Sequence, residues 1–228
     1  MIFTELPSGK SFEGNEIEAH KSDVQADKYV YLMAGTHGDE VEGVYVLKKL
    51  FEWLKEDHTL KDIPLVVIPI LNPDGYRSQS RVNSQGVDLN RNYPTDDWSG
   101  EYTQDKYNPG AGPLSEPENV FLDKLFKKYH PGVILSFHSW KPILNYNGDA
   151  KDIADYLASY NQYPVAGDIG YPTPGSLGTY APAKYSAPVL TFECPTLKED
   201  LTLQSIWEAN EKGLKSLLQS ELISKKLS

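Results

Sequence analysis

The amino-acid sequence predicts a single α/β domain of three layers (α/β/α), in which helices cover both faces of a mostly parallel, twisted sheet. Short and nearly continuous apolar runs, the pattern of strands buried on both faces, alternate along the chain with segments of helical periodicity. A length of 228 residues is sufficient for one undivided core of this class. We therefore expect residues 1–228 to form one domain.

The first strand-helix-strand unit lies in the first third of the chain. Residues 29–34 and 65–71 are the apolar runs of two buried strands. Because Pro69 lacks a backbone donor, the second run should bend there or lie beside an irregular edge. Between them, residues 41–55 place apolar side chains at helical spacing. This order predicts two strands joined by a helix that packs on the sheet.

Residues 72–114 form a long stretch rich in Gly, Pro, Asn and Asp, with little apolar periodicity. Loops of this length inside a compact domain are usually functional. A helix should follow, with Ser115 as N-cap, Pro117 in the first turn and Glu118 completing a capping box, and it should end near Tyr129.

The rest of the chain continues the alternation of strands and helices. We expect strands at residues 133–137 and 188–192, a helix at 153–160, and a closing amphipathic helix from 201 to about 223.

Composition excludes several classes of partner. The formal net charge is −10, whereas surfaces that bind nucleic acid need clustered Lys and Arg. No stretch is long and apolar enough to span a membrane, and residues 1–10 lack the features of a secretory signal, so we expect no membrane partner and a cytoplasmic location. The single cysteine, Cys194, is expected to be a buried thiol. Nothing in the sequence specifies the oligomeric state.

Side chains suited to metal binding or proton transfer stand at the ends of three apolar runs. The first run is followed by a turn that contains His37, Gly38 and Glu40, and later runs end at His138 and Glu193. Strand ends are the usual site of chemistry in open α/β sheets. Two histidines, a glutamate and a water form the shell of many catalytic zinc ions, which predicts a zinc site. Gly38 lacks a Cβ that would obstruct the close approach of its neighbours.

Two interpretations of Glu193 are open. A carboxylate at the end of a buried strand is by itself more often a helix cap or an ion-pair partner. Beside a zinc-activated water, however, it can accept a proton and pass it to a leaving amine. The three candidate zinc ligands favour this second interpretation.

The long loop carries guanidinium groups next to amide groups. Asn90 and Arg91 are adjacent, and this combination is suited to binding a carboxylate. Arg81 is a second cation that can stabilise an oxyanion, and Arg77 competes with it for that role.

Five ordered motifs resemble those of the zinc carboxypeptidases of the carboxypeptidase A superfamily, over residues 29–195. The motifs are His37-x-x-Glu40, Asn72-Pro73-Asp74-Gly75, Asp88-Leu89-Asn90-Arg91-Asn92, His138 and Thr191-Phe192-Glu193. The resemblance implies a zinc carboxypeptidase-like catalytic domain with a mixed sheet. It also implies one zinc ion per chain on His37, Glu40 and His138, with Glu193 as general base and acid.

The same resemblance implies roles for the loop residues. Asn90 and Arg91 match the pair that holds the free C-terminal carboxylate of a small peptide substrate. Arg81 matches the arginine that polarises the scissile carbonyl and stabilises its oxyanion. In the family a mobile tyrosine precedes a Gly-Ser step, which makes Tyr171 the first choice here and Tyr180 the second.

Two segments, residues 81–94 and 174–178, look more like those of the bacterial murein peptide amidases. Those enzymes cut the γ-D-glutamyl-diaminopimelate bond of cell-wall (peptidoglycan) peptides during recycling in the cytoplasm. Leu177, Gly178 and residues 140–149 should border the pocket for the released side chain, yet none of them identifies diaminopimelate by its own chemistry.

Three other functions fit part of the pattern. A general metallocarboxypeptidase would act on ordinary peptides. The turn at 35–40 also resembles deacylases of N-acyl amino acids, such as aspartoacylase and succinylglutamate desuccinylase, although the motifs at 72–75 and 90–92 favour the carboxypeptidases. A binding module without activity is disfavoured because all three ligands and the glutamate are present.

No motif assigns a role to the remaining histidines, His20, His58 and His130. Aromatic residues in long loops more often pack the loop against the domain than line a substrate subsite, which is our expectation for Trp98, Tyr102 and Tyr107.

Overall fold

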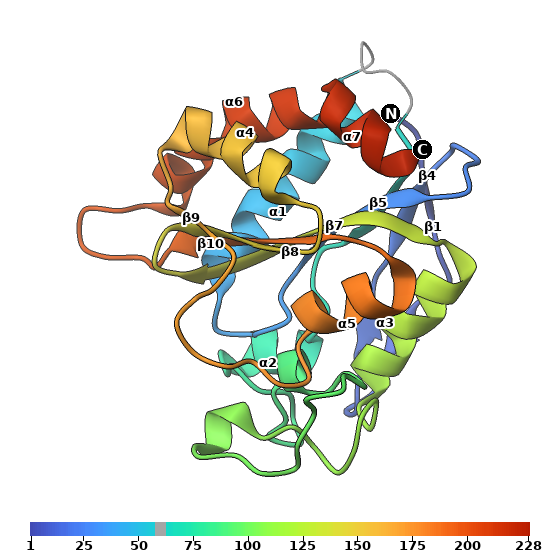
Figure 1. The fold of residues 1–228 in the computed structure, drawn as a ribbon, viewed down its shortest axis with the longest axis vertical. Helices are drawn as coiled ribbons and strands as arrows, with labels where there is room; N and C mark the ends of the chain where they lie inside the picture. Colours follow the sequence, from blue (N-terminus) through green and yellow to red (C-terminus); the bar gives the residue numbers. More distant parts are fainter. Residues whose placement is uncertain (58–62) are drawn as a thin grey trace.

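The computed structural model describes residues 1–57 and 63–228, so His58 lies outside the described residues. Within this part of the chain, one sheet of eight strands crosses the molecule in the order β1-β4-β6-β5-β7-β10-β8-β9. Helices lie on both faces of the sheet (Figure 1). The predicted three-layer α/β/α arrangement is confirmed.

The four central strands are parallel to one another and confirm the predicted buried runs. In sheet order they are β6 (Leu65–Ile68), β5 (Tyr29–Ala34), β7 (Pro131–Trp140) and β10 (Val189–Pro195). Almost every residue of these strands is buried, as expected for strands covered on both faces.

The outer strands make the sheet mixed, as the resemblance implies. On one side, β4 (His20–Ser22) runs antiparallel to β6, and β1 (Phe3–Glu5) runs antiparallel to β4. On the other side, β8 (Ile143–Asn147) runs antiparallel to β10 and parallel to β9 (Val165–Ala166).

One helical layer consists of α1 (Val41–Glu56), α4 (Lys151–Asn161), α6 (Leu203–Leu218) and α7 (Glu221–Leu227), which lie on the same side of the sheet in Figure 1. Their apolar side chains form one core cluster with alternate residues of the strands. Burial of this surface is the main force that stabilises the layer.

The second layer consists of α3 (Pro117–Lys128) and α5 (Leu177–Tyr185), with α2 (Pro73–Ser78) below the strand ends in Figure 1. A separate core cluster joins α3 and α5 to the sheet. This is the face on which the candidate site opens.

The structure corrects the lengths of two predicted elements. The strand predicted at 65–71 ends at Ile68, directly before Pro69, because proline cannot donate to the ladder. The closing helix predicted at 201–223 is two helices, because Ser220 is extended and its hydroxyl donates to the carbonyl of Leu217 at 2.6 Å.

The predicted capping box of α3 is wrong. Glu116 occupies the N-cap position and makes no side-chain capping bond. The hydroxyl of Ser115 instead donates to Glu116 Oε1 at 2.7 Å and accepts from Asn92 at 2.9 Å. Tertiary hydrogen bonds have therefore replaced the local cap. Pro117 is the first residue of the helix, in agreement with the prediction.

The long loop is more ordered than its composition predicts, with α2 and the short helices η1 (Leu89–Arg91) and η2 (Asp105–Tyr107) inside it. Asn72 caps α2 by accepting the backbone N–H of Gly75 at 2.9 Å. Asp74 accepts hydrogen bonds from Asn15 at 2.7 Å, Ser84 at 2.9 Å and Ser11. The motif at 72–75 therefore anchors the loop and the N-terminal segment, which contains the small sheet of β2 (Gly9–Lys10) and β3 (Glu16–Ile17).

Among the described residues, no helix has the length and apolar character needed to cross a membrane. Cys194 is buried and free, as predicted, and burial raises the pKa of its thiol.

Glu118 gives the fold a testable dependence on pH. Its side chain is buried, its Oε1 atom has no hydrogen-bond partner among the described residues, and burial raises its pKa from 4.5 to about 7. The folded chain thus keeps a proton that the unfolded chain loses, so stability falls as pH rises between these two values and stays reduced above them.

We expect Glu118→Gln to remove this decrease, which amounts to about 3 kcal/mol. The free energy of unfolding in urea, measured across that pH interval, tests it. The exposed Glu101→Gln is the control, and a Glu118→Gln variant with the pH slope of the parent chain would contradict the prediction.

Candidate metal centre

The three strand ends identified in the sequence meet at the centre of the sheet. β7 lies between β5 and β10, and the parallel register pairs His138 with Glu193. The turn that follows β5 carries His37 and Glu40. All four side chains line one cavity.

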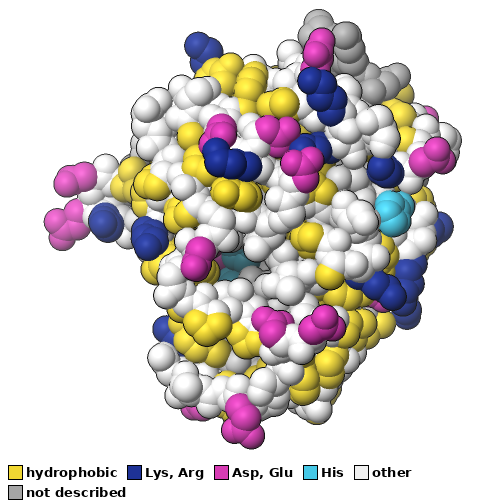
Figure 2. All heavy atoms as spheres, viewed as in Figure 1, with side chains coloured by type: hydrophobic (Ala, Val, Ile, Leu, Met, Phe, Trp, Pro, Cys, Tyr) yellow, Lys and Arg dark blue, Asp and Glu magenta, His cyan; other side chains and the backbone are white. Residues whose placement is uncertain are grey.

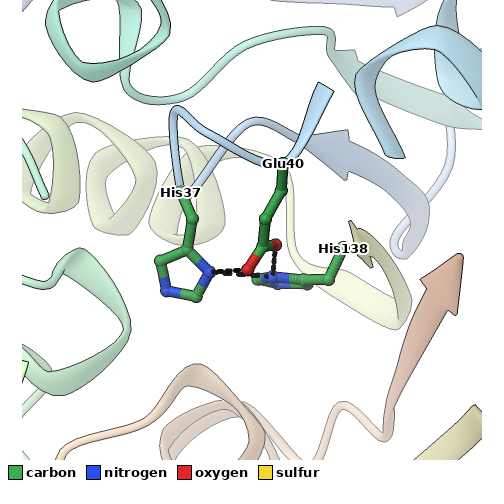
Figure 3. Close-up of side chains that lie close together, drawn as sticks. All are labelled: His37, Glu40 and His138. Atoms are coloured by element: carbon green, nitrogen blue, oxygen red, sulfur yellow. Dashed lines mark hydrogen bonds and ion pairs between the residues drawn. The ribbon is translucent and has the colours of Figure 1, made fainter. Parts of the chain in front are cut away.

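The side chains of His37, Glu40 and His138 point toward one another (Figure 3). Glu40 Oε1 lies 2.8 Å from His37 Nδ1, and Glu40 Oε2 lies 2.8 Å from His138 Nδ1. The two Nδ1 atoms are 3.2 Å apart, and the potential ligand atoms all lie within 4.8 Å of one another. Two imidazoles and one carboxylate that face a common point fit a catalytic zinc ion with an open position.

Further hydrogen bonds orient both imidazoles. Asp88 Oδ1 lies 3.0 Å from His37 Nε2, and Ser136 Oγ lies 3.0 Å from His138 Nε2. These partners leave the Nδ1 atom of each ring directed at the common point. The sequence motifs assign no separate role to Asp88 or Ser136. The spacing of Ser136 and His138 is the available signal, because residues i and i+2 lie on one face of a strand.

The three side chains are coupled electrostatically. Burial would raise the pKa of Glu40, but the two imidazoles hold it well below its usual range. Burial would lower the pKa of His37, but the carboxylates of Glu40 and Asp88 raise it to about 9. The surroundings therefore favour positive charge between the ligands, which suits a divalent cation.

Glu193 lies next to this group on β10. Its Oε2 atom is buried and has no hydrogen-bond partner among the described residues. Burial raises its pKa to about 7, while the nearby imidazoles act in the opposite direction. A carboxyl group that titrates near neutrality can both accept and return a proton.

Arg91 is a buried cation that lines the same cavity. Arg91 is only 5% exposed, and its Nη1 donates to the carbonyl of Asn90 at 2.7 Å. It forms no ion pair within the described part of the chain, whereas Arg81 pairs with both Glu40 and Asp88. Asn90 Oδ1 accepts the backbone N–H of Leu177 at 2.9 Å, which orients the amide.

The structure separates the two candidate arginines of the loop. Arg81 lines the cavity and donates to Asp88 Oδ2 from Nε at 3.2 Å and from Nη2 at 2.9 Å. Its Nη1 lies 3.3 Å from Glu40 Oε1. Arg77 is exposed in the last turn of α2 and does not line the cavity.

The two candidate tyrosines are separated in the same way. Tyr171 is 40% exposed, lines the cavity, and lies edge-on to Trp140 with ring centroids 6.1 Å apart. Tyr180 is buried on α5, where its hydroxyl donates to Asp123 at 2.7 Å. Only Tyr171 is therefore near the zinc-ligand group.

One loop aromatic supports the cationic side chains. The ring of Tyr107 lies 5.6 Å from the guanidinium carbon of Arg81 and 5.4 Å from that of Arg91. Tyr107 thus holds both cations by cation-π contacts, a role that the sequence did not reveal. Among the other histidines, His20 packs on Phe51, and His130 lies 3.2 Å from a carbonyl oxygen of α5.

The cavity has a volume of about 140 Å³. Figure 2 shows it as a hollow with a histidine side chain at its bottom. Trp140, Asn145, Asn147 and Gly178 are part of its lining, as expected for the border of a side-chain pocket. Leu177 is not, because its side chain is buried in the core between α5 and the sheet.

The fold and the donor set define a class of protein. The sequence matches the zinc carboxypeptidase family over residues 2–201, and the chain belongs to this family. It is therefore a hydrolytic enzyme, and its metal cofactor is zinc.

Within the family, the chain is close to the murein peptide amidases. Murein peptide amidase A of Vibrio campbellii is 30% identical over 220 residues, which cover 91% of this chain and 86% of that protein. The enzyme of the same name from Escherichia coli K12 is 31% identical over 198 residues, covering 80% of this chain and 75% of the relative.

Solved structures agree with this placement. The murein-tripeptide amidase of Escherichia coli O157 matches with a TM-score of 0.79 and 27% identity, covering 93% of this chain and 90% of the other. The carboxypeptidase A of Helicoverpa armigera matches with a TM-score of 0.79 at 21% identity. This match covers 99% of the present chain and 68% of the Helicoverpa chain. The second match shows that the fold is that of carboxypeptidase A.

Gly38 allows the turn that carries His37 and Glu40 to pack against α2. A Cβ at this position would lie 2.0 Å from the backbone carbonyl carbon of Gly75, and the backbone cannot move aside easily. We expect Gly38→Ala to destabilise the fold by about 2 kcal/mol or more and to weaken zinc binding by about tenfold or more.

Thermal unfolding and competition with a zinc chelator measure these two effects. Gly112→Ala is the matched control, because a Cβ there meets no atom within 4 Å. A Gly38→Ala protein with the melting temperature and zinc affinity of the parent would show that the close contact is unimportant.

Proposed function

We propose that this enzyme releases the C-terminal residue of small murein peptides by hydrolysing their γ-D-glutamyl-diaminopimelate bond. The observation that carries the proposal is the buried guanidinium of Arg91, which has no ion pair among the described residues and faces the cavity of the zinc-ligand group. A buried cation favours an anionic partner, and the free carboxylate of a peptide supplies one. Similarity to murein peptide amidases over most of both chains supports the choice of substrate.

In this proposal His37, Glu40 and His138 hold the zinc ion, while Asp88 and Ser136 fix the orientation of the two imidazoles. When bound, zinc would polarise the scissile carbonyl and lower the pKa of a water molecule. The carboxyl group of Glu193 is ionised more readily beside that positive charge.

Glu193 then acts first as general base and later as general acid. It accepts a proton from the attacking water and returns it to the amine that leaves with the released residue. The buried Oε2 atom, which has no partner among the described residues, is available for this transfer.

The loop residues bind the peptide. Arg91 and Asn90 hold its terminal carboxylate through charge-assisted hydrogen bonds. Arg81 stabilises the oxyanion that develops on the scissile carbonyl, because its Nη1 is directed toward the ligand group while Nε and Nη2 are held by Asp88. Tyr171 contacts the peptide from the open side of the cavity. By the resemblance set out above, the reaction belongs to cell-wall recycling in the cytoplasm.

A panel of substrates tests the proposed reaction. We expect the zinc-loaded enzyme to hydrolyse L-Ala-γ-D-Glu-meso-diaminopimelate with a kcat/KM about tenfold or more above that for ordinary α-linked peptides. N-acetyl and N-succinyl amino acids, included as deacylase substrates, should remain intact. Release of the C-terminal residue is followed by chromatography. Cleavage of the ordinary peptides alone would identify a general carboxypeptidase instead.

The role of Glu193 has a separate test. We expect Glu193→Gln to bind one zinc ion per chain, because this residue is outside the ligand set, and to lose about three orders of magnitude in kcat. Metal analysis and steady-state kinetics measure the two quantities, with the exposed Glu101→Gln as control. A zinc-bound variant with normal turnover would remove Glu193 from the mechanism.

A further inference from the structure

The wall of the cavity beyond Glu193 is built from alternate residues of two neighbouring strands. In the antiparallel register of β10 and β8, Thr191 pairs with Asn145, and Glu193 pairs with Ile143. Side chains alternate between the faces of a strand, so Thr191 and Asn145 lie on the face of Glu193, and Asn147 follows on the same face. The intervening Leu190 and Phe192 belong to the apolar core on the opposite face.

This wall offers hydrogen-bonding groups that the protein itself does not use. Among the described residues, the side chains of Asn147 and Thr191 have no hydrogen-bond partner, although both line the cavity. Asn145 donates its amide to the carbonyl of Ala166 at 2.9 Å, which leaves its own side-chain oxygen as an acceptor. The wall therefore provides an N–H₂ donor, a hydroxyl group and amide oxygens.

The segment that follows β9 adds a negative charge to the cavity. Asp168 lines the cavity, and its Oδ1 atom accepts the backbone N–H of Gly170 at 2.7 Å. Its carboxylate has no ion-pair partner within residues 1–57 and 63–228. An unpaired carboxylate at the cavity is suited to an ammonium group of the substrate.

A glycine makes room for the free amide. A Cβ on Gly178, at the start of α5, would lie 2.5 Å from the side-chain oxygen of Asn147. Any larger residue at position 178 would therefore push Asn147 from its place on the cavity wall.

We propose that Asp168 and Asn147, with Thr191, select a released residue whose side chain ends in both an ammonium and a carboxylate group. Asp168 binds the ammonium, and the amide of Asn147 and the hydroxyl of Thr191 donate to the carboxylate. This inference rests on the proposed function and names the part of the substrate that determines its specificity.

Released residues with other side chains would leave some polar groups of this cavity without hydrogen-bond or ion-pair partners. An apolar side chain would remove water from Asn147 and Thr191 and offer no hydrogen bond in return. A side chain with an ammonium group alone would satisfy Asp168 but not the N–H₂ group of Asn147. A side chain with only a carboxylate would be repelled by Asp168 and Glu193.

Three peptides of the form L-Ala-γ-D-Glu-X separate these contributions, where X is meso-diaminopimelate, L-lysine or L-norleucine. For the zinc-loaded enzyme we expect kcat/KM to fall in that order. Asp168→Asn should reduce kcat/KM by about tenfold for diaminopimelate and lysine and leave norleucine unchanged. Asn147→Leu should reduce it by about tenfold for diaminopimelate alone. Gly178→Ala should repeat the pattern of Asn147→Leu, and it serves as the second variant if that protein does not fold.

Calorimetric binding of the three free amino acids to the zinc-loaded protein gives a second measurement that does not need turnover. The same order of affinities, with the same changes in the variants, supports the assignment even if no γ-D-glutamyl peptide is cleaved. Binding in this order without cleavage of the peptides would reject the proposed reaction but support the selection of the side chain by Asp168 and Asn147.

Asp96→Asn is the control, because it removes the same charge from an exposed residue that does not line the cavity. Equal rates and affinities for the three amino acids, or variants that reduce all three equally, would overturn the assignment of Asp168 and Asn147.

Discussion

A chain of hydrogen-bonded ionisable side chains in a buried location is the interaction on which the rest of this structure depends. Arg81 pairs with Asp88, Asp88 with His37, His37 with Glu40, and Glu40 with His138. Each of these groups would be costly to bury alone, so each requires the next to be held within hydrogen-bond distance. The requirement fits the return of the long loop over the ends of β5 and β7, where its Asp88 reaches His37.

The same requirement explains how a loop with so little regular structure is held in one place. Side-chain amides and carboxylates stand in for the missing backbone ladder: Asn83 accepts the N–H groups of Gln85 and Val87, and Asn92 donates to the carbonyls of Pro109 and Gly112. A loop fixed in this way positions its guanidinium groups before substrate arrives. Such preorganisation is what electrostatic stabilisation of a developing charge needs.

Two strands serve both the core and the cavity because their side chains alternate. On β10, Leu190 and Phe192 pack into the apolar layer with α1 and α6, while Thr191 and Glu193 face the cavity. On this polar face the Oε2 atom of Glu193 is buried without a hydrogen-bond partner among the described residues, so the site keeps a desolvated carboxyl group beside the zinc ligands. Catalysis and selection of the released side chain thus occur on one continuous strand surface.

Local sequence patterns determined the central part of this protein. The apolar runs of β5, β7 and β10 predict buried parallel strands, and the turn that contains His37 and Glu40 has enough local information to indicate a metal site. In contrast, the short outer strands β1, β8 and β9 are too brief to show an alternating pattern, and only pairing with their neighbours defines them.

Tertiary structure alone decided which of several similar residues reach the site. Arg81 and Arg77 are equivalent by composition, as are Tyr171 and Tyr180, and the outcome depends on the direction of α2 and α5. Ser115 lost its predicted capping role because its hydroxyl bonds to the adjacent Glu116 and to Asn92, which the fold brings close. Residue type and spacing thus determine what chemistry a chain can perform, whereas long-range packing and pairing of buried charges determine which residues perform it.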